Sequence, residues 1–158
     1  MLSESPNFWY KEFPDCGKKR QSPININSNL AEEAGHLRHF DIGDYLESGT
    51  INNMTVWNNG WTVTVQVESN IKIKGGGLEG IYSLRHFHLH WGFQNARGSE
   101  HSLNGNSYPM EVHIVHRKNK VKDKYEALKD PNGFAVFGVF VKTSTSQRYI
   151  FHTKFRSM

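Results

Sequence analysis

The chain has 158 residues, the length of one ordinary domain, and 13% of them are aromatic, which supplies enough apolar material for a hydrophobic core. The formal charge of +4 is mildly basic, and no apolar run of about 18 residues is present, which argues against a membrane-spanning helix. The densest basic segment, residues 117–124, lacks interleaved aromatic residues and any nucleic-acid motif. It is therefore typical of a solvated loop, and no nucleic-acid partner is predicted.

The first twenty residues predict irregular structure. The N-terminus lacks the basic start and apolar middle of a signal peptide, so none is expected in residues 1–6. Cys16 is the only cysteine, which excludes an internal disulfide and a zinc site built from cysteines. Residues 20–26 then predict a turn that leads into a short alternating strand.

The middle of the chain begins without a strong period, and residues 31–34 fit a helical turn and a loop equally well. The turn residues at 58–60 precede residues 61–67, where apolar and polar side chains alternate as in a half-buried strand. The glycine-rich residues 74–77 predict a loop. Because the Gly-Lys-Ser/Thr ending of a phosphate-binding loop is missing there, a nucleotide site is not predicted.

Histidines recur at alternate positions in residues 84–92 and 111–116, and both segments predict β-strands. Side chains two residues apart in a strand point to the same face. In the first segment one face carries His86, His88 and His90, opposite Phe87, Leu89 and Trp91. In the second segment one face carries Glu111, His113 and Val115, opposite Val112, Ile114 and His116.

This pattern suits a metal site. Two imidazoles from one strand and a third from its neighbour can surround a tetrahedral metal ion and leave the fourth position for water, as in catalytic zinc sites. Spacing alone does not decide which of His86, His88 and His90 bind metal, and the histidines could also be packing residues.

The C-terminal third predicts three further features. Residues 125–129 favour a short helix that ends at the turn residues 130–133. Residues 134–141 form an unbroken apolar run, which is typical of a strand buried on both faces. Residues 143–158 are polar, basic and aperiodic, and no strand is predicted there. No repeat, linker or second domain is visible, so the sequence predicts one β-rich domain.

Taken together, these motifs resemble the alpha-class carbonic anhydrases, from about Trp9 to Lys142. The segments that carry the resemblance are residues 20–26, 58–60, 74–76, 87–92, 98–101, 111–116 and 131–136. The resemblance implies a mainly β fold with a twisted, largely antiparallel central sheet, few short helices and a conical cavity that ends at zinc. It further implies one partial domain over residues 1–158, with the C-terminal part of the domain missing and a divergent tail at 143–158.

The resemblance assigns roles to individual residues. It makes His88, His90 and His113 the metal ligands of a Zn2+ cofactor, supported by Glu111, which matches the carboxylate behind the third ligand. Glu100 matches the acidic member of the pair that orients the zinc-bound hydroxide, a catalytic role. Val115 and Val136 match apolar residues that line the carbon dioxide pocket.

Three other histidines are expected to lie outside the ligand set. His86 occupies the position of a supporting glutamine and is expected to contact the ligands or line the pocket. His101 resembles a buried family histidine beside the supporting carboxylate. His116, on the opposite strand face, is expected to be a core residue.

The implied function is that of carbonic anhydrase, a lyase that reversibly hydrates carbon dioxide to bicarbonate and a proton through a zinc-bound hydroxide. The alternative is a zinc-binding but catalytically impaired binding module, or a fragment that does not fold stably by itself. Trp61 motivates the alternative, because it occupies the position of a proton-shuttling histidine and an indole does not titrate. The threonine that hydrogen-bonds the zinc hydroxide and the acid is not identifiable after Lys142, so the chain is expected to be a truncated form.

Two features bear on the cellular compartment. Cys16 matches the position where exported members of the family hold one half of a disulfide. A glycosylation sequon occurs at Asn53, with Thr55 as its hydroxyl residue. Both features hint at a secretory ancestry.

Overall fold

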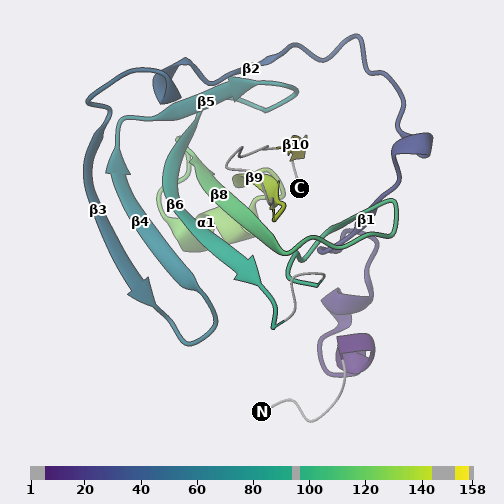
Figure 1. Ribbon diagram of the computed structural model, residues 1–158. Helices are drawn as coiled ribbons and strands as arrows, with labels where there is room; N and C mark the ends of the chain where they lie inside the picture. The colour runs from purple at the N-terminus through teal and green to yellow at the C-terminus, as the bar shows by residue number, and fades with distance from the viewer. Residues whose placement is uncertain (1–5, 94–96, 144–151, 157–158) are drawn as a thin grey trace.

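A computed structural model describes residues 6–93, 97–143 and 152–156 of the chain. One strongly twisted, eight-stranded antiparallel sheet dominates it (Figure 1). Six strands follow the order β10-β9-β8-β6-β4-β3, while β5 pairs with β6 and β2 pairs with β5. The bounds are β2 Phe40–Asp41, β3 Ile51–Asn58, β4 Val63–Ser69, β5 Lys72–Gly75, β6 Tyr82–Trp91, β8 Met110–Lys118, β9 Phe134–Val141 and β10 His152–Arg156. The predicted mainly β, largely antiparallel fold is confirmed.

Short elements surround this sheet. A parallel pair joins β1 (Asn25–Ile26) to β7 (Ser102–Leu103) and so ties the N-terminal segment to the loop after β6. The helices are η1 Pro6–Lys11, η2 Pro14–Gly17, η3 Ser28–Leu30, η4 Gly43–Tyr45 and α1 Lys124–Lys129. Among the described residues, none of these helices has the length and apolar character needed to cross a membrane.

The predicted elements agree with these bounds, with local differences. The strand expected from residue 61 begins at Val63, because the side chain of Asn59 accepts hydrogen bonds from the backbone N–H groups of Trp61 and Thr62 and holds both in the turn. The short helix expected at 125–129 forms α1, where the Asp123 carboxylate caps the first turn. Residues 31–34 form a loop.

Five strands were not predicted: the short strands β2, β5 and β7, and the longer β3 and β10. Residues 74 and 75 of the loop predicted at 74–77 belong to β5. β3 is exposed along its whole length, so no burial pattern marks it in the sequence. β10 pairs with β9 through its backbone, from His152 opposite Phe140 to Arg156 opposite Val136. The rest of the predicted tail lies outside the described residues, apart from Thr143.

The hydrophobic core lies on one face of the sheet. It contains two clusters of buried side chains: Val65, Val67, Ile71 and Leu84 in one, and Ile73, Tyr82, Ala135 and Phe137 in the other. On β9, Ala135, Phe137 and Val139 are buried, whereas Val136 and Gly138 on the other face are only half-buried. The prediction of a strand buried on both faces is therefore correct for the core face and only partly correct for the other.

His116 belongs to this core, as expected from its strand face. Its exposed fraction is 0%, and the Tyr45 hydroxyl lies 2.6 Å from its Nε2. Its Nδ1 lies 3.3 Å from the Ala135 carbonyl oxygen. Burial lowers the pKa of His116 to about 4, so the ring is neutral at neutral pH, donating to Ala135 and accepting from Tyr45.

The two features that hint at export both lie on the surface. Cys16 is exposed on η2 as a free thiol. Asn53 and Thr55 are exposed on β3.

Candidate metal centre

Strand pairing brings the three predicted metal ligands together. In the β6–β8 register His88 lies directly opposite His113, and His90 lies opposite Glu111. The ring centroids of His88 and His90 are 4.9 Å apart, those of His88 and His113 are 5.1 Å apart, and those of His90 and His113 are 4.4 Å apart. One nitrogen from each ring lies within 4.8 Å of the others, so the three residues could hold one metal ion.

The protonation state of the cluster also suits a metal. Burial, together with repulsion from His113 and His90, lowers the pKa of His88 to about 4. Burial lowers the pKa of His90 as well, against the opposing effect of Glu100. Both rings are therefore neutral at pH 7, the form that binds metal ions.

One atom in the cluster lacks a partner. Nε2 of His90 is buried and has no hydrogen-bond partner within the described ranges. Buried polar atoms are rarely left unsatisfied. A donor set of three imidazoles with an unpaired buried nitrogen fits zinc, whose catalytic sites use three such ligands.

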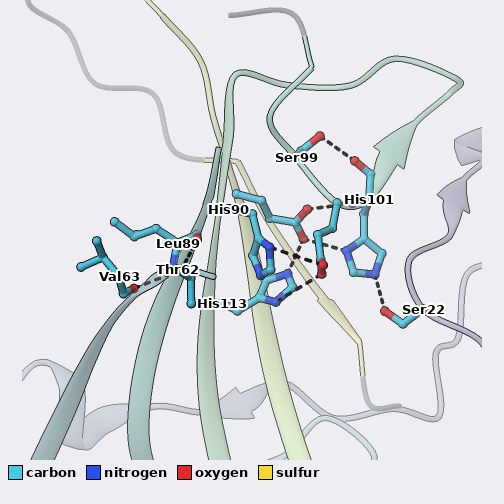
Figure 2. A network of polar contacts seen from close by, with 10 residues as sticks. Ser22, Thr62, Val63, Leu89, His90, Ser99, His101 and His113 are labelled. Atoms are coloured by element: carbon cyan, nitrogen blue, oxygen red, sulfur yellow. Dashed lines mark hydrogen bonds and ion pairs between the residues drawn. The ribbon is translucent and has the colours of Figure 1, made fainter. Parts of the chain in front are cut away.

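Glu111 fixes the orientation of the third imidazole. Its Oε1 lies 2.8 Å from Nε2 of His113, which leaves Nδ1 of that ring on the side of the cluster (Figure 2). Burial alone would raise the pKa of Glu111, whose exposed fraction is 2%, but hydrogen bonds from His113 and from the backbone N–H of His101 lower that pKa to about 2. The carboxylate is therefore charged, and such a partner raises the basicity of a ligating imidazole.

His101 contacts the same carboxylate. Its Nδ1 lies 2.8 Å from Oε1 of Glu111, and its backbone N–H donates to Oε2 at 2.9 Å. Its Nε2 lies 3.2 Å from the hydroxyl oxygen of Ser22, so a chain of polar contacts runs from Ser22 to His113 (Figure 2). The sequence analysis did not single out Ser22; the β1–β7 pairing brings it to His101, although the two residues are 79 positions apart.

Glu100 stands at the edge of the cluster. Its Oε1 lies 3.4 Å from Nδ1 of His90, and its Oε2 lies 3.9 Å from Nδ1 of His113. Both distances exceed those of short, charge-assisted hydrogen bonds. With 39% of its side chain exposed, Glu100 is more exposed than His90, whose side chain is 22% exposed. Its carboxylate can accept hydrogen bonds beside the three imidazoles.

The remaining predicted site residues line the same sheet face. The His86 ring stacks on His88 with a centroid distance of 5.4 Å, and no ring nitrogen of His86 belongs to the three-imidazole cluster. Val115 lies opposite His86, and Val136 lies opposite Val115. Val136 lines an apolar cavity of about 70 Å³ beside His113, which Ile24 and Phe140 also line.

Trp61 lies at the turn before β4 and is 93% exposed. The neighbouring Thr62 hydroxyl contacts the backbone carbonyl of Leu89, the residue before His90 (Figure 2). This contact ties the turn to the strand that carries two of the imidazoles.

Comparisons with known proteins agree with this geometry. A family model described as eukaryotic-type carbonic anhydrase matches residues 4–157. Carbonic anhydrase 7 from Homo sapiens is 38% identical over 144 residues, which cover 89% of this chain and 53% of the relative. Carbonic anhydrase 3 from Homo sapiens is 35% identical over 140 residues, which cover 87% and 52%. The chain thus spans about half the length of the curated relatives it matches.

Proposed function

This chain belongs to the eukaryotic-type carbonic anhydrase family, and on that premise we propose that it binds one zinc ion and reversibly hydrates carbon dioxide to bicarbonate. The ligands are His88, His90 and His113. The observation that carries the proposal is the convergence of these three imidazoles from two neighbouring strands, with one nitrogen of each within 4.8 Å of the others.

When bound, zinc supplies Lewis-acid chemistry that lowers the pKa of a coordinated water to about 7. The three imidazoles would occupy three of the four positions that zinc prefers, which would leave one for water. Glu111 holds the His113 ring through the 2.8 Å contact and keeps its proton on Nε2. Glu100 accepts a hydrogen bond from the reacting group at the solvent side, and Val115 and Val136 provide apolar surface for carbon dioxide.

A second candidate function is a zinc-binding module without fast turnover. The observation that favours it is Trp61, which is exposed at the turn beside β6 and carries no group that titrates near neutral pH. Such a module keeps the metal and the sheet, while proton export limits any hydration.

Metal content and activity of the purified chain separate these functions. The chain is loaded with zinc and dialysed, its metal is quantified, and carbon dioxide hydration is followed by stopped flow with and without a sulfonamide. We expect one zinc per chain and a sulfonamide-sensitive rate. His113→Ala removes a ligand and should abolish both, whereas His36→Ala, a change at an exposed histidine, should leave both intact.

The three outcomes have different meanings. Stoichiometric zinc with a sulfonamide-sensitive rate supports the enzyme. Stoichiometric zinc with hydration at the buffer background supports the binding module. Failure of a folded chain to take up zinc rejects both functions.

A further inference from the structure

Two arginines on the sheet have buried side-chain nitrogens without partners. Nε of Arg85 and Nε of Arg117 are both buried, and neither has a hydrogen-bond partner in the described part of the chain. Neither arginine forms an ion pair there, whereas Lys118 next to Arg117 contacts Glu79 and Asp130. Unsatisfied buried donors are uncommon in native structures and point to an absent acceptor.

The two arginines lie on neighbouring segments of β6 and β8. Arg117 on β8 pairs with Ser83 of β6, and Arg85 is the extra residue of the bulge between Leu84 and His86 on that neighbouring strand. Burial lowers the pKa of Arg85, and the positive charge of Arg117 lowers it further. No negatively charged group is among the causes of this shift.

Arg117 lies on the same sheet face as the metal centre. Side chains two residues apart in a strand share a face, so Arg117 follows His113 and Val115 on one side of β8. Four residues of extended strand separate Arg117 from His113, a spacing of about 13 Å. Arg117 is thus outside the coordination distance of the three imidazoles.

Two adjacent, half-buried cations repel each other and have lost part of their hydration. An anion between them would remove the repulsion and provide acceptors for the unpaired N–H groups. The planar fork of a guanidinium matches the oxygens of carboxylates and phosphates, and two forks favour a ligand with two negative charges.

We propose that Arg85 and Arg117 together bind a doubly charged oxyanion of the phosphate or sulfate class, at a site between their neighbouring segments of β6 and β8. This site goes beyond the proposed function, because it requires neither zinc nor turnover. Binding therefore persists after the metal has been removed.

Calorimetric titration of the chelator-treated chain with sodium sulfate, at ionic strength held constant with sodium chloride, tests the site. The wild-type chain should show saturable binding of about one sulfate, and inorganic phosphate should compete for it. Arg85→Gln and Arg117→Gln should each weaken binding at least tenfold, and the double variant should abolish it. Lys122→Gln removes the same charge from an exposed loop position and should leave binding unchanged.

Charge-conserving variants distinguish a specific loss of sulfate binding from a loss caused by misfolding. Arg85→Lys and Arg117→Lys keep the positive charge but lose the fork, so folded variants should bind sulfate more weakly than the wild type. Absence of saturable binding to the wild-type chain overturns the proposal. So does an equal loss of binding in Lys122→Gln, or binding that occurs only after zinc has been added.

Discussion

Gly138 leaves the space that the Glu111 carboxylate occupies: a Cβ on Gly138 would stand 2.9 Å from Oε1 of Glu111. Gly138 lies on β9 directly opposite His113 of β8. The neighbour of His113 on β9 therefore has no side chain. The buried carboxylate uses this space to reach Nε2 of His113. A glycine that shows no sign of its role in the sequence therefore controls the orientation of a candidate metal ligand.

Gly138→Ala should displace the Glu111 carboxylate, because the methyl group and Oε1 cannot both keep their places. Loss of the support for a ligating imidazole typically costs about 10–100-fold in metal affinity. Zinc titration against a competing chelator measures this loss. Gly35→Ala is the matched control, since a Cβ there meets nothing within 4 Å. Unchanged zinc affinity in a folded Gly138→Ala chain would show that Glu111 does not position His113.

Tyr45→Phe should destabilise the core without affecting the metal. The change leaves the buried Nε2 of His116 without its 2.6 Å hydrogen bond, which costs about 1–3 kcal/mol. Urea denaturation measures the free energy of unfolding, and zinc titration should give the wild-type affinity. Tyr125→Phe removes an exposed hydroxyl and should be neutral. Equal stability of the two variants would contradict the role of the Tyr45–His116 contact.

The free energy of unfolding should depend on pH because His116 has a lowered pKa in the folded chain. Burial lowers the pKa of this ring from 6.5 to about 4. Between these values the unfolded chain binds the proton and the folded chain does not. The contribution of His116 to the free energy of unfolding is therefore fully present above pH 6.5. It decreases by at most about 1.4 kcal/mol per pH unit as the pH falls toward 4, and below pH 4 there is no further decrease from this residue.

Urea denaturation of the metal-free chain between pH 7 and 4.5 checks this slope. His88, whose pKa is also lowered to about 4, contributes a slope of the same sign. The comparison is therefore with His116→Gln, which should retain the His88 contribution and lose that of His116. Identical slopes for the two chains would rule out the buried neutral state of His116.

Trp61→His should raise the rate of carbon dioxide hydration if the chain is an active enzyme. The change places a group with a pKa near 6.5 on the exposed turn that Thr62 ties to β6. A positioned proton-transfer group contributes about 10²-fold or more. Stopped-flow rates at low buffer concentration should rise, and the gain should disappear at high buffer concentration. Trp61→Phe, which adds no titrating group, serves as the control.

The amino-acid pattern alone is enough to predict which side chains share a strand face. The alternation of His86, His88 and His90, and that of Glu111, His113 and Val115, follow from the pleat of a strand, which is a local property. The core position of His116 follows from the same alternation. The family motifs then singled out His88, His90 and His113 as the ligand set, and the structure brings those three together.

How these faces meet depends on the pairing of distant segments in the folded chain. The register that sets His88 opposite His113, the space at Gly138 and the approach of Ser22 to His101 all join segments that are far apart in the sequence. The proximity of Arg85 to Arg117 also depends on a bulge that shifts one strand against its neighbour. Pairing between strands is set by contacts across the whole sheet, so these relationships have no local pattern from which they could be predicted.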